Sequence, residues 1–149
     1  MTGERFFLHY AFPCAEDKYL AGKISFGDYQ LLKRSVQIPG LSPDRELLAR
    51  CFPTACQRFS TFTIREGLEP WSLSTVAEYW RHHHEGKEHC TVRLATIKVT
   101  GKIRDQDEVF LVDCDGQGIF VSNPLHYQLR PGDQVYVHWQ VIVEKVESE

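Results

Sequence analysis

The stretch TVRLATIKVTGKI (residues 91–103) and the stretch DEVFLVDCDGQGIFVSN (residues 107–123) decide the fold. In both, β-branched and other apolar residues alternate with polar ones, which is the period of a half-buried strand. Asp115-Gly116 divides the second stretch and is a typical hairpin turn. A third stretch, DQVYVHWQVIVEKV (residues 133–146), predicts one long strand or a bent pair. Roughly four to six short strands are too few for a two-layer sandwich, so we predict a small OB-like or SH3-like β-barrel, whose closure removes exposed strand edges.

The residues before the barrel have a different periodicity. Apolar side chains recur there at helical spacing, and Asp28 to Arg34 predicts one or two turns of helix. We therefore expect an α+β protein with a helical region over residues 1–86 and a small barrel over residues 87–149. The helices are short enough to depend on tertiary packing.

Helix boundaries are predicted from capping residues and prolines. Ser42-Pro43 predicts a helix start, and Pro53 predicts the end or a kink of that helix. The next helix should run to Gly67. A third helix should begin at Ser74 or Thr75, with Thr75 and Glu78 as a capping box, and should stop at Gly86.

Composition limits the classes of function. The 149 residues carry a formal net charge of -3, which argues against a sequence-independent nucleic-acid binder. No apolar run is long enough for membrane insertion, and the N-terminus does not resemble a signal peptide. The five cysteines are not arranged as a disulfide framework, so we expect reduced thiols and a cytoplasmic protein.

The densest group of metal-ligand residues is HHHEGKEHC, which contains His82, His83, His84, His89 and Cys90. Imidazole and thiolate together suit zinc, copper, nickel and iron. Three consecutive histidines point in different directions around a helix, however, so they cannot all face one ion. A solvated helix end, where histidine favours the negative end of the dipole, is the alternative interpretation.

The remaining cysteines favour packing roles. Cys51 and Cys56 lie among apolar neighbours without a second ligand pair, so we interpret them as core thiols. Cys14 follows Pro13 in an expected loop, and Cys114 precedes the Asp115-Gly116 turn. Both are interpreted as structural.

The sequence contains no constellation that predicts an enzyme. No Ser-His-Asp order, phosphate-binding glycine loop or HExxH motif is present. His138 alternates with Val137 in a strand and should share a face with Tyr136 and Gln140, where a hydrogen-bonded structural histidine is the ordinary interpretation.

Residues 90–149 resemble the HypC/HupF family of nickel–iron hydrogenase maturation chaperones. These small barrels open with a cysteine and a strand, here CTVRLATIKV (residues 90–99), and end with a Gly-Asp-x-Val-x-Val-His block, here within PGDQVYVHWQVIVEKV (residues 131–146). The motifs YAFP (residues 10–13) and EYW (residues 78–80) are similar to the helical part of HypC-like proteins found with hydrogenases. The resemblance therefore covers most of the chain.

The resemblance implies a metal site and partners. It places Cys90 and His138 where the family keeps its iron-binding pair, with His89 as a third ligand or a neighbour of the ligands. The cargo would be an iron ion carrying cyanide and carbon monoxide, bound transiently. The partners would be the hydrogenase large subunit or its precursor and a HypD-like iron–sulfur scaffold protein. Thiolate and imidazole alone would leave other coordination positions for the diatomic ligands and the partner.

The chain also departs from the family. Cys90 is internal rather than N-terminal, and Trp139-Gln140-Val141 replaces the usual Gly-Phe-Ala after the histidine. Trp139 and Gln140 are therefore candidate partner-contacting residues, as are the aromatic residues Phe12 and Trp71 of the helical region, for which core packing is the alternative.

Two other functions remain open. The first is a metal-free interaction or assembly module associated with a hydrogenase or another metalloenzyme complex. The second is a zinc enzyme using the cluster from His82 to Cys90, which would need a stably bound metal with an open coordination position.

Overall fold

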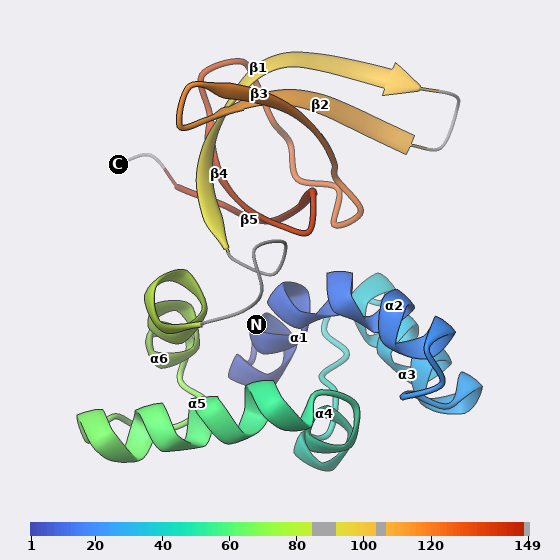
Figure 1. Ribbon diagram of the computed structural model, residues 1–149, viewed down its shortest axis with the longest axis vertical. Coiled ribbons are helices and arrows are strands. Elements are labelled where there is room, and N and C mark those ends of the chain that lie inside the picture. The colour runs from blue at the N-terminus through green and yellow to red at the C-terminus, as the bar shows by residue number, and fades with distance from the viewer. Residues whose placement is uncertain (85–91, 104–106, 148–149) are drawn as a thin grey trace. The chain divides into compact units, whose positions relative to one another are not determined.

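Helices come first and strands second along the chain in this computed structural model, which describes residues 1–84, 92–103 and 107–147 (Figure 1). The chain divides into a helical unit, Met1–Glu85, and a barrel unit, Gly86–Glu149. The predicted α+β class, with helices followed by a small barrel, is confirmed. In the described part of the chain, no helix is both long enough and apolar enough to cross a membrane.

The helical unit is built from short segments joined by tight connections (Figure 1). They are α1 (Gly3–Ala11), the 3-10 turn η1 (Phe12–Cys14), α2 (Ala15–Leu20), α3 (Phe26–Gln37), α4 (Arg45–Cys51), α5 (Pro53–Glu66), α6 (Leu73–Glu78) and the π-helix η2 (Tyr79–His83).

Proline and glycine end α4 and α5 as predicted. The helix α4 stops at Cys51, and Pro53 occupies the first turn of α5, where its missing N–H costs no hydrogen bond. The helix α5 ends at Gly67, which adopts a left-handed conformation with φ of 63°. The predicted stop of the third helix at Gly86 is wrong, because the helix ends at His83 and His84 has an extended backbone.

Three helix starts differ from the prediction, and in two of them a side chain other than the predicted one caps the helix. The N-cap of α4 is Asp44, whereas the hydroxyl group of Ser42 is hydrogen-bonded to that of Thr2 at 2.6 Å. The N-cap of α6 is Ser72, whose hydroxyl oxygen accepts from the Thr75 N–H at 3.2 Å. Ser25 caps α3 in the same way, so this helix extends well beyond the predicted one or two turns.

Aromatic rings from distant parts of the sequence form the core of the helical unit. Phe7 of α1 lies between Phe59 and Trp80, with ring centroids 5.6 and 5.1 Å away. Trp71 packs on Phe7 and Phe59, and Tyr79 contacts Phe59 at 5.4 Å. Edge-to-face pairs of this kind add to the stabilisation from apolar burial.

A buried arginine fixes the end of α3 against α1. The Arg5 guanidinium donates hydrogen bonds to four backbone carbonyl oxygens at the C-terminus of α3 and just beyond it, those of Ser35, Val36, Ile38 and Leu41. The positive charge compensates the carbonyl groups that a helix end leaves without partners.

The barrel unit contains five described strands: β1 (Arg93–Ile103), β2 (Asp107–Cys114), β3 (Gln117–Ser122), β4 (Gln134–His138) and β5 (Val141–Lys145). They close in the order β1-β2-β3-β5-β4, with β4 antiparallel to β1 and β3 parallel to β5. This Greek-key order is that of an OB-like barrel, one of the two predicted alternatives. The stretch over residues 133–146 thus forms a strand pair rather than one long strand.

The barrel core is aliphatic and follows the strand alternation. It contains Ala95, Ile97, Phe110, Val112, Cys114, Val121, Val135, Val137 and Ile142. The β2–β3 turn is formed by Asp115 and Gly116, both with positive φ, as a tight hairpin requires.

Candidate functional site

The β4–β5 hairpin carries three of the residues singled out in the sequence. His138 pairs with Val141, so Trp139 and Gln140 form a two-residue turn. Both have positive φ values, 56° and 59°, as in a type I′ turn. Such turns ordinarily use asparagine and glycine, and the left-handed conformation costs other residues about 1–2 kcal/mol each. The strained backbone therefore needs support from its surroundings.

Barrel closure supplies that support. The Gln140 carbonyl oxygen accepts a hydrogen bond from the Ser122 N–H at 3.0 Å, and Ser122 pairs with Val141 where β3 and β5 run parallel. The turn that follows His138 is thus held in place by the contact that closes the barrel.

His138 is fully buried at the end of β4. Val135 and Val137 belong to the barrel core, so strand alternation places His138 on the opposite face of β4 from them. The orientation of a buried imidazole ring is set by the groups that contact it. The position is therefore suited to a histidine whose ring orientation is fixed.

The start of β1 lies beside this histidine. In the antiparallel β1–β4 pair, Arg93 is opposite Val137, so the chain before Arg93 and the His138 end of β4 occur at the same end of the pair. Val92, the first described residue before β1, is buried. Cys90 and His89, the other two predicted metal ligands, lie outside the described residues.

Phe12 and Trp71 belong to the packing of the helical unit. Trp71 is half-buried against Phe7 and Phe59, with the Arg45 guanidinium 5.4 Å from its ring centroid. Phe12 is half-buried and stacks on Tyr29, with centroids 6.4 Å apart. Their part in binding a partner stays a prediction.

The other cysteines have the surroundings of packing residues. Burial raises the pKa of the Cys51 thiol to about 11 and that of the Cys56 thiol to about 12, so both are protonated at neutral pH. A thiol rather than a thiolate is a poor nucleophile and a poor metal ligand. Cys114 lies in the barrel core, and Cys14 is half-buried in η1.

The three consecutive histidines do not form one site, and two of them are not a solvated helix end. His82 is exposed, but the His83 ring lies 4.4 Å from that of Phe62 and the His84 ring lies 4.2 Å from that of Trp80, measured between centroids. His83 is the last residue of the π-helix η2, and His84 follows it with an extended backbone. Among the described residues, no group of three or more His, Cys, Asp or Glu side chains is placed to hold a metal ion.

An apolar row on the outside of the barrel was not predicted. Val99 pairs with Leu111, and Leu111 pairs with Phe120, so the three side chains cross β1, β2 and β3 side by side. Val99 and Phe120 are 56% and 68% exposed. The β-bulge between Ile97 and Val99 sets this register, and alternation alone does not reveal the position of a bulge.

Comparison of the chain with protein-family models, with curated proteins and with solved structures found no match. Functional proposals for this chain therefore depend on its own residues and their geometry.

Proposed function

We propose that this protein is an accessory protein of nickel–iron hydrogenase maturation, in which Cys90 and His138 hold an iron ion carrying cyanide and carbon monoxide. The observation that supports this most is the β1–β4 register, because it brings the start of β1 beside His138. Cys90 precedes Arg93 by three residues, so its Cα lies within roughly 11 Å of the Arg93 Cα in any conformation. A cysteine only three residues before Arg93 can reach the end of β4.

The chemistry of the pair suits a carrier rather than an enzyme. A thiolate and an imidazole bind iron while leaving most coordination positions to the cargo's own ligands and to the receiving protein. A carrier must also release its cargo, which a closed four-ligand site would hinder. His89 adjoins Cys90 and is the third candidate ligand or a hydrogen-bonding neighbour of the ligands.

The partners of this carrier would be the hydrogenase large subunit or its precursor and a HypD-like iron–sulfur scaffold protein. Trp139 and Gln140 follow His138 directly and are held by barrel closure, so a partner that contacts the iron would also contact this turn. Phe12 and Trp71 would add contacts from the helical unit.

The test is iron analysis and infrared spectroscopy on protein isolated without oxygen from its native host, as wild type, Cys90→Ser and Cys14→Ser. Iron and the cyanide and carbon monoxide stretching bands should be present in wild type, absent in Cys90→Ser, and retained in Cys14→Ser, which makes the same chemical change in the helical unit. Absence of iron from wild type, or equal iron in all three proteins, would refute the carrier function.

The apolar row favours a second candidate, a metal-free assembly module. A row of two exposed residues, Val99 and Phe120, on either side of the half-buried Leu111 is a typical protein-binding surface. In this case Phe120→Ser should abolish binding to the purified large-subunit precursor, while Cys90→Ser binds as well as wild type. The carrier function predicts weakened binding of the iron-loaded protein in Cys90→Ser instead.

A further inference from the structure

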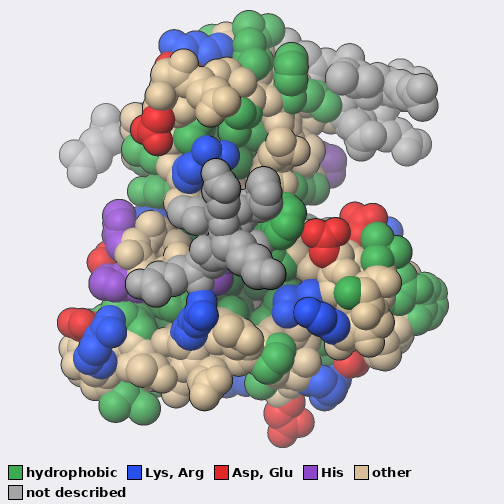
Figure 2. Space-filling model, in the orientation of Figure 1, with side chains coloured by type: hydrophobic (Ala, Val, Ile, Leu, Met, Phe, Trp, Pro, Cys, Tyr) green, Lys and Arg blue, Asp and Glu red, His purple; other side chains and the backbone are tan. Residues whose placement is uncertain are grey.

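A polar hollow in the helical unit lies between α5 and η2, independently of the barrel and of the proposed iron site. Its volume is about 440 Å³, within the range of small-molecule sites. Figure 2 shows histidine and basic side chains gathered on the α5 and α6 side of this unit. The hollow is lined by Arg58, Thr61, Phe62, Arg65, His82 and His83, among others.

The α5 wall of the hollow is a single helical stripe. Arg58, Thr61, Phe62 and Arg65 occupy positions i, i+3, i+4 and i+7 of the helix, so their side chains share one face. The two arginines stand two turns apart on either side of Thr61 and Phe62, and their long side chains can converge over the middle of the stripe. The stripe thus presents two guanidinium groups, a hydroxyl and an aromatic ring to one ligand.

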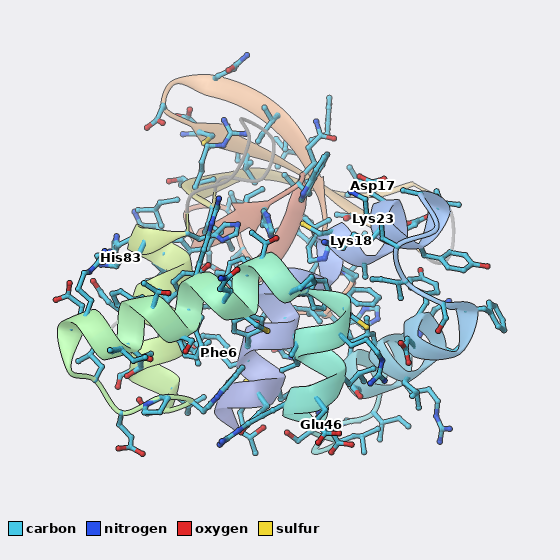
Figure 3. All side chains as sticks on the ribbon, turned by 60° about the horizontal axis from the view of Figure 1, so that its bottom comes forward. Phe6, Asp17, Lys18, Lys23, Glu46 and His83 are labelled. Atoms are coloured by element: carbon cyan, nitrogen blue, oxygen red, sulfur yellow. The ribbon has the colours of Figure 1, made fainter. Side chains whose placement is uncertain are left out.

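The opposite wall is formed by the π-helix. A π-helix is rare and often occurs at functional sites. Here η2 brings both His82 and His83 to the hollow, and His83 lies against the Phe62 ring at 4.4 Å with an interplanar angle of 30°. Figure 3 labels His83 beside α5. The aromatic ring of Phe62 is buried and forms part of the floor.

The charges in and around the hollow favour an anion. The described part of its lining contains two arginines and two histidines and no carboxylate. Two acidic neighbours lie outside the lining: Glu66 pairs with Arg65 at 3.1 Å, and Glu78 lies 3.4 Å from His83. The Arg65–Glu66 pair is exposed, so it contributes little free energy and leaves the Arg65 guanidinium available to a more highly charged ligand.

We propose that this hollow binds a small organic phosphate, with Arg58 and Arg65 contacting the phosphate group and Phe62 and His83 contacting the attached organic group. Arginine presents a planar fork of donors that matches phosphate oxygens, and Thr61 adds a hydroxyl donor between the two arginines. The hollow exceeds the size of a phosphate ion, which is the reason to expect an organic group on it.

The test is calorimetric titration of the full-length protein with phenyl phosphate, inorganic phosphate and phenol. We expect phenyl phosphate to bind about tenfold more tightly than inorganic phosphate, and phenol not to bind, because both the charge and the ring contribute. Arg58→Gln and Arg65→Gln should each weaken phenyl phosphate binding about tenfold. Arg34→Gln removes the same charge from an exposed position on α3 and should leave the affinity unchanged.

Three results would contradict the proposed organic-phosphate site. The first is no binding of phenyl phosphate at millimolar concentration. The second is an equal loss of affinity in Arg34→Gln, which would indicate attraction by net charge alone. The third is unchanged affinity in both α5 variants, whose retained fold is checked by circular dichroism because both side chains are exposed.

Discussion

Different interactions stabilise the interior of each of the two units of this protein. In the helical unit, the core joins aromatic residues that are far apart in the sequence, such as Phe7 and Trp80, whose ring centroids are 5.1 Å apart. In the barrel unit, β1, β2 and β3 pair with their neighbours in sequence, and the core is mainly aliphatic. Long-range aromatic packing and a buried charge therefore stabilise the first unit, whereas strand register and turn conformation stabilise the second.

Replacing Arg5 should have the largest effect and should be confined to the helical unit. Arg5→Met leaves the four carbonyl oxygens at the end of α3 without their donor. We expect a loss of about 4 kcal/mol in unfolding free energy, since buried charged hydrogen bonds are costly to break. Amide hydrogen exchange measures the loss of unfolding free energy separately for each unit.

Lys33→Met is the matched control, because it removes an exposed charge from α3, the helix whose end Arg5 contacts, and should cost less than about 0.5 kcal/mol. Equal loss of protection in the barrel strands would contradict the expectation that the effect of Arg5→Met is confined to the helical unit.

Acid should weaken the helical unit through His9. Burial, and secondarily the Arg5 charge, lower the pKa of His9 from 6.5 to about 4 in the folded protein. The unfolded state therefore takes up the proton first, so the stabilisation is complete above about pH 6.5 and is lost as the pH falls towards 4. The loss should be about 3 kcal/mol, measured by urea unfolding at several pH values.

His9→Leu should remove this part of the pH dependence. If the variant loses stability with falling pH as steeply as wild type does, the assignment to His9 is wrong.

A methyl group at Gly3 should disturb the close contact of α1 with Trp71. A Cβ atom there would overlap the Trp71 carbonyl oxygen. Gly3→Ala should cost about 2 kcal/mol, as overpacking does in other cores. Gly27→Ala is the control, because a Cβ atom at this α3 position meets open space and should stabilise the helix by about 0.5–1 kcal/mol. Thermal unfolding of both variants measures the difference, and equal effects would exclude the close contact as the cause.

The smallest effect should be a gain of stability in the barrel turn. Gln140 is exposed and has a positive φ of 59°, a conformation that glycine adopts without strain. Gln140→Gly should therefore stabilise the barrel unit by about 1 kcal/mol, as measured by urea unfolding. Gln134→Gly, at an exposed position within β4, should instead destabilise it. Destabilisation by both would show that the turn is not strained.

The difference between the helical unit and the barrel unit also explains how much of the fold could be predicted from the sequence. Alternation and the Asp115-Gly116 turn are local signals, and they predicted the strands and the barrel correctly. The helix starts predicted at Ser42 and at Ser74 or Thr75 were wrong, because several neighbouring residues can occupy the N-cap position of a helix. The Arg5 contacts join residues 30 to 36 positions apart, and no local pattern indicates them.

The candidate site was predictable only in part. Strand alternation predicts that His138 lies on the opposite face of β4 from Val137, whereas Gln140, predicted to share the face of His138, lies in the turn. The full burial of His138 depends on tertiary packing. The stripe of Arg58, Thr61, Phe62 and Arg65 is visible as helical spacing in the sequence, whereas the π-helix that completes the hollow is not. The left-handed turn conformation of Trp139 could not be predicted either, because tryptophan seldom occurs at such positions.

The central claim is that Cys90 and His138 hold one iron ion together. Its most direct measurement is the iron content and infrared spectrum of anaerobically isolated Cys90→Ser, His138→Gln and the double variant, with hydrogen exchange of β4 and β5 to verify folding. A shared site predicts that each single variant loses the iron and its diatomic bands, and that the double variant loses no more. Full retention of iron in folded His138→Gln, with loss in Cys90→Ser, would contradict it.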